Sequence, residues 1–453
     1  MNIEFIKRLL RSGLWLVVLG GMIAGASAQT NAPFHAAWPT NTYWRSLEID
    51  PGVYIDHPYR IGLFRPVNGE DRGRLWSQTK SVFFYGLGVV GVLAALPESA
   101  TGWDPDTDIT AKWKQNVRDG PVWDRDNWAY NYIGHTYCGG VYYQVARKSG
   151  YRQWDAFVYS FLMSTFYWEY GVEAFAETPS IQDLVVTPVM GWVYGEWAYQ
   201  TEMNIRDSNN EVLDSKTLGA VSLFFLDPID TLGRSVNRVV GRPWVKAGHG
   251  YFTYSAVPVN DDVDHTVMLN MSFPVGLPSG PAGPSGEEAV RYDRGNDPVD
   301  TGLVGLSVGT GMALLDDNWG VDDCFYMKYA LGLYFSPRFS TRLAYAQGDA
   351  EVIATGRNIP YENYSFDAQY YFNAKHSLRP YITAGIGEQM WDKKDESKNL
   401  EINAGIGLLW QIHPKWALHS DWICYHNSSA KTYDQNFSAS VVYRFGDGEH
   451  HDW

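Results

Sequence analysis

Residues between Thr301 and Phe445 alternate between apolar and polar or small side chains with a period of two. In the segment from Leu400 to His413, almost every second residue is apolar, and most residues between them are polar or glycine. An extended strand separates odd from even positions in this way, whereas a helix does not. One apolar face and one polar or small face is typical of a strand in a membrane β-barrel.

The same alternation recurs in about eight segments, which is the smallest strand number found in closed outer-membrane barrels. The predicted strands lie near residues 304–314, 325–335, 339–349, 364–373, 379–390, 400–413, 416–427 and 437–445. Short turns at 373–376 and 413–415 alternate with longer links at 356–362 and 392–398, which is typical of periplasmic turns and outer loops. A soluble β-sandwich is the alternative, but its strands would not all keep a lipid-sized apolar face.

Residues 127–275 have a different pattern, which predicts a helical domain with trailing strands. Three helices are expected at 131–148, at 154–177 and from Ser180 toward Gln200, where Ser-Ile-Gln-Asp resembles a capping box. A fourth amphipathic helix is expected at 228–240, followed by strands at 251–257 and 265–273. If those two strands joined the barrel, it would have about ten strands and a narrow lumen.

The N-terminus carries basic residues, then an apolar stretch, then Ala-Ser-Ala before Gln29. This order predicts a signal peptide over residues 1–28, and the alternative is an uncleaved membrane anchor. Residues 29–126 read as loops with one apolar helix at 81–97, which is too short and glycine-rich to favour a membrane span over a helix buried in protein. Proline and glycine predict a linker over 276–300, and residues 446–453 form a polar tail.

The composition narrows the function. Aromatic residues make up 15% of the 453 residues, which suits membrane interfaces. The formal charge of -15 and the lack of a basic cluster exclude nucleic acid as a partner. The three cysteines, Cys138, Cys324 and Cys424, have no spacing typical of a disulfide framework or a zinc knuckle. We therefore expect them to act as small buried or lipid-facing apolar residues.

Particular strand sequences extend this interpretation. With VGLSVGTG, YSFDAQYYFN and RPYITAGIG, residues 301–445 resemble the OmpA-like outer-membrane barrel. The terminal SVVYRF is similar to the aromatic-ended strand recognised during barrel assembly, although eight residues follow Phe445. Relatives of OmpA often continue into a peptidoglycan-binding domain, but this sequence ends in GDGEHHDW, so we do not expect cell-wall anchoring.

The helical region carries three long motifs, NWAYNYIGHTYCGGVYYQVAR, WEYGVEAFAETPSIQDLVVTPVMGWVYGE and FLDPIDTLGRSVNRVVGRP. Through them, residues 127–242 resemble an uncharacterised bacterial family, numbered 3943 among the domains of unknown function. That resemblance implies no activity and no catalytic residue.

One histidine and several carboxylates fall on the apolar helices, where burial without a partner is costly. The candidate catalytic residues are His135, Glu169, Glu173, Asp183 and Glu196. One interpretation is a site for a divalent metal or for acid/base chemistry. The favoured interpretation is a polar core in which the carboxylates pair with Arg147, Arg234 and Arg238. No cofactor is predicted and the metal is left open, because no HExxH, P-loop or GxSxG motif stands in its required context.

The sequence therefore predicts a mainly β outer-membrane protein whose C-terminal antiparallel barrel anchors an N-terminal helical domain, either periplasmic or within the barrel. The helical domain is expected to bind or organise an envelope component. Expected partners are outer-membrane lipid, the barrel assembly machinery and an envelope lipid or glycan. An enzyme that modifies envelope lipid or glycan is one alternative, resting on fold-level analogy with barrels that modify lipid A, and a narrow channel is another.

Overall fold

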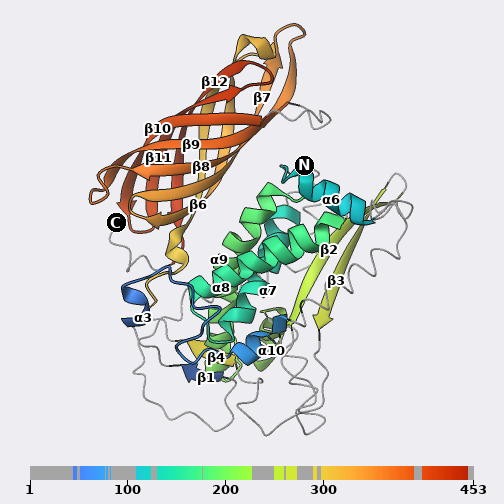
Figure 1. The fold of residues 1–453 in the computed structure, drawn as a ribbon, viewed down its shortest axis with the longest axis vertical. Coiled ribbons are helices and arrows are strands. Elements are labelled where there is room, and N and C mark those ends of the chain that lie inside the picture. Colours follow the sequence, from blue (N-terminus) through green and yellow to red (C-terminus); the bar gives the residue numbers. More distant parts are fainter. Residues whose placement is uncertain are drawn as a thin grey trace.

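The structure is a computed structural model with two main parts, a barrel built from the last third of the chain and a group of helices (Figure 1). It describes residues 44–47, 52–76, 78–79, 82, 109–123, 130–175, 177–226, 249–259, 262–272, 289–292, 297–391 and 400–446.

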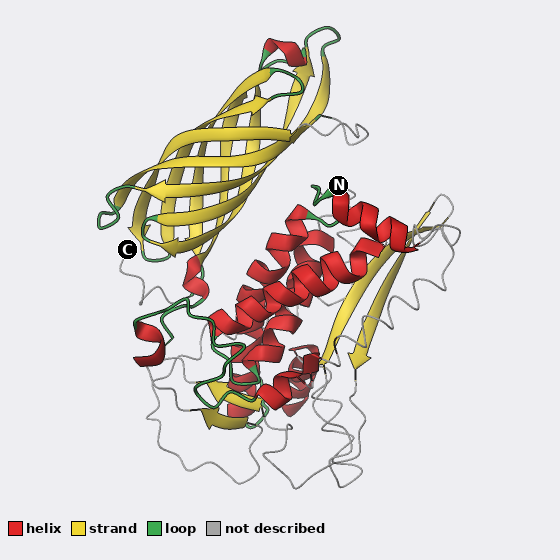
Figure 2. Ribbon diagram, viewed as in Figure 1, coloured by secondary structure: helices red, strands yellow, loops and turns green. Residues whose placement is uncertain are grey.

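Eight antiparallel strands form a closed barrel, which confirms the predicted fold class (Figure 2). The strands are β5 (Val304–Leu314), β6 (Cys324–Ser336), β7 (Phe339–Val352), β8 (Arg357–Tyr371), β9 (Leu378–Met390), β10 (Leu400–His413), β11 (Trp416–Asn427) and β12 (Thr432–Arg444). Each strand pairs with its neighbour in the chain, and β12 returns to pair with β5. Closure leaves no strand edge of the barrel unpaired.

The two faces of the strands differ as the alternation predicts. In β11, the side chains of Trp416, Leu418 and Trp422 are exposed, whereas those of His419 and Asp421 are buried. Successive residues of a strand point to opposite faces. The apolar set therefore forms the outer wall of the barrel and the polar set fills the inside.

Ion pairs occupy the barrel interior. Asp421 accepts hydrogen bonds from Lys328 Nζ at 2.9 Å and from Arg342 at 2.7 Å. Arg342 also donates to Asp367 at 3.0 Å, and Asn403 donates to Asp367 at 3.0 Å. Side chains from five strands thus meet across the lumen, as expected for a barrel of this size.

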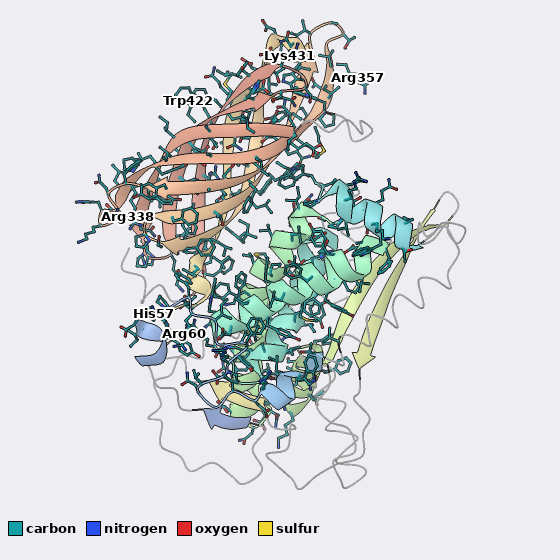
Figure 3. The ribbon with its side chains drawn as sticks, viewed as in Figure 1. His57, Arg60, Arg338, Arg357, Trp422 and Lys431 are labelled. Carbon is teal, nitrogen blue, oxygen red and sulfur yellow. The ribbon has the colours of Figure 1, made fainter. Side chains whose placement is uncertain are left out.

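The two ends of the barrel differ in their connections. At one end, the strands are joined by residues 337–338, 372–377 and 414–415. At the other end they are joined by residues 315–323, 353–356 and 428–431, besides the connection between β9 and β10. Arg338 lies at the first end, and Arg357 and Lys431 lie at the opposite end (Figure 3). The prediction of a link at 356–362 is wrong, because β8 begins at Arg357, which pairs with Val352.

The helical part contains α7 (His135–Arg147), α8 (Gln153–Leu162) and α9 (Ile181–Asp207), flanked by α3 (Gly52–Ile55), α6 (Ile109–Asp119) and α10 (Lys216–Leu226). The predicted cap is confirmed, because the backbone N–H of Asp183 donates to Ser180 Oγ at 3.2 Å.

Two predicted helices depart from α-helical geometry. The first begins with a π-helix, η1 (Tyr130–Gly134), before α7. The predicted helix over 154–177 is not continuous, because α8 passes into a π-helix, η2 (Met163–Val172), and then a 3₁₀ turn, η3 (Glu173–Phe175). A π-helix bonds residue i to i+5 and widens the turn, which a four-residue sequence spacing does not reveal.

Two small sheets lie outside the barrel. β2 (His249–Val259) and β3 (Asp262–Ser272) are the two predicted strands, and they pair only with each other, so the ten-stranded alternative is wrong. β1 (Trp44–Leu47) pairs in parallel with β4 (Ala289–Tyr292), which lies inside the segment assigned to a linker.

The helices contact the outside of the barrel wall. The ring of Trp123 stacks on that of Tyr364 in β8, with centroids 4.9 Å apart. The outward-facing Leu331 and Leu343 belong to the same apolar cluster as residues of α7, α8 and α9. A strip of β6, β7 and β8 is thereby covered by protein instead of being exposed.

Some predictions fall outside the residues that the structure describes. They concern the signal peptide, the apolar helix at 81–97 apart from Val82, the helix at 228–240 and most of the tail. Among the helices that are described, none combines the length and apolarity needed to cross a bilayer.

Candidate functional site

Three of the predicted site residues converge between the helices. His135 is the first residue of α7, Glu169 lies in η2, and Asp183 lies in the first turn of α9. One nitrogen or oxygen atom from each lies within 4.8 Å of the other two, and all three side chains are buried. We call His135, Glu169 and Asp183 the buried triad.

Hydrogen bonds orient the buried triad. His135 Nδ1 lies 3.1 Å from Thr187 Oγ1 and 3.5 Å from Asp183 Oδ1. The backbone N–H of Ser180 donates to Glu169 Oε2 at 3.2 Å, while the Ser180 hydroxyl caps α9 at Asp183. Ser180 therefore ties the two carboxylates to the same helix terminus.

A close helix crossing brings α7 onto α9. A Cβ atom on Gly139 would lie 1.8 Å from the carbonyl oxygen of Thr187 and 3.0 Å from the Cα of Gly191. Only glycine fits at this position. Because His135 is one turn before Gly139 and Asp183 one turn before Thr187, this approach sets the distance between the two side chains.

Burial determines the charge of the histidine. It lowers the pKa of His135 to about 4, so the imidazole is neutral at pH 7. A neutral imidazole carries one nitrogen with a lone pair, which is the form that accepts a proton or binds a metal ion.

Glu173 extends the acidic group toward the surface. It is partly buried in η3, and four residues later Glu177 is exposed. Burial, followed by the nearby carboxylates of Glu169, Glu177 and Asp183, raises the pKa of Glu173 well above its usual range. A row of carboxylates thus connects the buried triad with the surface.

All three cysteines of the chain are free, and Cys138 lies beside the acidic group. Burial, with the charges of Glu173 and Asp183, raises the pKa of the Cys138 thiol to about 12. The thiol is therefore protonated at neutral pH and is not a ready nucleophile.

Glu196, the fifth candidate, is not part of the buried triad. Its carboxylate accepts hydrogen bonds from Arg147 Nε at 2.8 Å and from the Tyr143 hydroxyl at 2.5 Å, all buried. The favoured interpretation, in which arginine pairs with these carboxylates, holds here for Arg147. Arg234 and Arg238 lie outside the described residues.

Sequence reasoning missed Thr187 and the two π-helices. The four-residue spacing from Asp183 to Thr187 places both on one face of α9, and this spacing is the signal that could have found Thr187. Nothing in the sequence pattern distinguishes η1 and η2 from α-helix.

The arrangement supports two kinds of chemistry. One imidazole and two carboxylates are suitable ligands for a divalent cation. The same groups are able to transfer a proton to or from a bound molecule.

Comparisons with known proteins address both halves of the chain. Residues 120–229 match the family model described as Domain of unknown function (DUF3943), and residues 282–445 match the Outer membrane protein beta-barrel domain. No curated protein matches the chain.

Several solved structures resemble the barrel. Neisserial surface protein A has 13% sequence identity to this chain, in an alignment that covers 31% of this chain and 97% of that protein, with a TM-score of 0.28. The N-terminal barrel domain of Pseudomonas aeruginosa OprF has 16% sequence identity, in an alignment that covers 32% of this chain and 98% of that domain, with a TM-score of 0.23. The attachment invasion locus protein Ail of Yersinia pestis has 14% sequence identity, in an alignment that covers 31% of this chain and 97% of that protein, with a TM-score of 0.25.

The two family matches agree with the closed eight-stranded topology. This chain carries a DUF3943 segment at residues 120–229, followed by an outer membrane protein β-barrel domain at residues 282–445.

Proposed function

We propose that the barrel inserts into the outer membrane and anchors the helical domain, which joins the periplasmic end of the barrel and packs against the strip of β6, β7 and β8, and that this domain binds or organises an envelope component. The observation that carries this proposal is a closed barrel with an apolar outer wall and an interior filled by ion pairs. Such a barrel suits an anchor, because its outside is compatible with lipid and its inside is occupied by its own side chains.

The connections of the barrel support the orientation. β5 begins and β12 ends at the same end as the short turns 337–338 and 414–415, and short turns are periplasmic in barrels of this type. The chain enters β5 through Asp297, which is bound to the start of α8. The helical domain is therefore joined to the periplasmic end.

The outer face of the barrel, the strand β12 and the helical domain each suggest a partner. Outer-membrane lipid would contact exposed apolar side chains such as Ile406, Trp410 and Val441. The barrel assembly machinery would engage β12, whose sequence continues to Phe445. The helical domain would take an envelope lipid or glycan.

Insertion is tested by gel mobility of the full chain from purified outer membranes, with and without heating. We expect a mobility shift on heating, because a folded barrel resists detergent. Absence of the shift, or absence of the protein from that fraction, would overturn the membrane location.

Orientation is tested with Arg357→Cys and Arg338→Cys in a chain whose three native cysteines are replaced by serine. Both arginines are exposed, at opposite ends of the barrel (Figure 3). We expect a membrane-impermeant maleimide to label the Arg357→Cys variant in intact cells, and the Arg338→Cys variant only after the outer membrane is permeabilised. The reverse order would place the helical domain outside the cell.

A second candidate function is an enzyme that modifies envelope lipid or glycan, and the convergence of the buried triad favours it. The test compares His135→Ala and Glu173→Gln with the unmodified chain. Variants that insert normally but change the envelope lipid profile support an enzyme. Loss of folding in both indicates a structural cluster.

A narrow channel is the third function considered from the sequence, and the ion pairs that cross the lumen weigh against it. We expect no steady conductance from the full chain in planar bilayers. Reproducible single-channel steps would revive this alternative.

A further inference from the structure

We propose that the buried triad of His135, Glu169 and Asp183 binds one divalent transition-metal ion, with zinc as the probe of choice. The three donors come from three separate segments of the chain, and their ligand atoms still lie within 4.8 Å of one another. Residues 34 and 14 positions apart in sequence have no local reason to meet there.

The donor spacing is close to that of a metal site. Tetrahedral ligands at about 2.1 Å from a metal lie about 3.4 Å apart. No spacing here exceeds 4.8 Å, so side-chain movements of about 1.4 Å are enough to close the set. Such a movement is within the reach of a glutamate, which has three rotatable side-chain bonds.

One surrounding hydrogen bond holds a donor in the way that metal ligands are held. The backbone N–H of Ser180 donates to Oε2 of Glu169, and a partner of this kind orients a ligand and tunes its basicity. Thr187 Oγ1 instead contacts Nδ1 of His135, the nitrogen that faces Asp183, and would be displaced by a metal ion bound at Nδ1.

The local backbone is also unusual on both sides of the buried triad. The π-helix η1 ends at Gly134, directly before His135, and the π-helix η2 contains Glu169. Isolated π-helical turns are rare and occur frequently at functional sites. One of the two π-helices contains Glu169, and the other ends directly before His135.

The chemistry of the donor set selects the kind of ion. The donor set is two carboxylate oxygens and one imidazole nitrogen, a combination that binds divalent metal ions. An imidazole ligand favours zinc, copper, nickel or iron, whereas calcium, magnesium and manganese prefer oxygen ligands.

The experiment measures zinc binding to the full chain in detergent after treatment with a chelator. All proteins carry His450→Ala and His451→Ala, which removes the paired histidines of the tail as competing ligands. We expect one zinc ion per chain, and at least a 100-fold weaker affinity in His135→Ala and in Glu169→Gln. Glu211→Gln, at a partly exposed carboxylate in an ion pair with Lys216, is the matched control and is expected to bind as the parent does.

Two further measurements keep the proposal testable if a variant folds poorly. Zinc should raise the unfolding temperature of the parent and not that of the isosteric Asp183→Asn. Cobalt bound to the parent should show d–d absorption, which reports coordination without any substitution.

Three outcomes would overturn the proposal. They are less than one tenth of a zinc ion per parent chain, equal affinity in the parent and His135→Ala, and displacement of zinc by millimolar magnesium.

Discussion

Asp297 accepts a hydrogen bond from the backbone amide of Gln153 at 3.0 Å, and so links the residue that leads into the barrel to the first turn of α8. The Asp297 carboxylate also lies 3.5 Å from the Arg152 guanidinium, which is fully buried and 3.5 Å from Asp155. A single buried cation thus holds carboxylates from both parts of the protein, and this joint is where we expect the two parts to be coupled.

The joint predicts a pH dependence. Burial raises the pKa of Asp155 and of Asp297 to about 6, against the opposing charge of Arg152. At these two carboxyls the folded state binds protons more tightly than the unfolded state, so their contribution to stability is fully present below about pH 4 and is lost as the pH rises through about 6. Each carboxyl contributes up to about 3 kcal/mol across this interval.

Urea unfolding of the helical domain, followed by tryptophan fluorescence between pH 4.5 and 7.5, measures this effect. Asp297→Asn should make the slope smaller by removing the contribution of one of these two carboxyls, whereas Asp119→Asn in α6 should leave it unchanged. An identical slope in the parent and Asp297→Asn would contradict the assignment.

The helix crossing predicts that Gly139→Ala is strongly destabilising. The new methyl group would overlap the backbone of α9 at Thr187, so the helices must separate at a cost of about 3 kcal/mol or more. Gly134→Ala is the control, because it has helical dihedral angles and open space around its Cβ position. Thermal unfolding of the two variants should differ clearly, and similar melting temperatures would show that the crossing is looser than described.

Glu196 is predicted to act in folding and not at the buried triad. Glu196→Ala leaves the buried charge of Arg147 without this carboxylate, which should cost about 3–5 kcal/mol. Glu211→Ala breaks a surface pair and should have no measurable effect. Urea unfolding measures both, and a mild effect of Glu196→Ala would mean that water or another group compensates Arg147.

The barrel interior predicts a further stability effect. Asp421→Ala removes the carboxylate between Lys328 and Arg342 and brings two buried cations into repulsion. The temperature at which the unheated gel band disappears should fall. Asp322→Ala, at an exposed residue of a long link, is expected to match the parent. Equal transition temperatures would show that the interior pairs contribute little.

Much of the barrel could be predicted from the chain. The alternation in Leu400–His413 reports directly which side chains lie on the outer face of the barrel, because neighbouring strand residues point to opposite faces whatever their partners are. The cap at Ser180 was also predictable, since it depends on residues within one turn. The strand β8 was predicted too short, because its first residues are held by pairing with β7, which is a long-range contact.

The sequence by itself determined the barrel class, the helical domain and the set of residues from which a site could be built. Only the tertiary structure decided that His135, Glu169 and Asp183 meet while Glu196 turns to Arg147. Periodicity records the direction of a side chain relative to its own helix or strand. The distance between two helices depends on how closely their backbones pack, and here a single hydrogen in place of a Cβ at Gly139 allows the approach that assembles the buried triad.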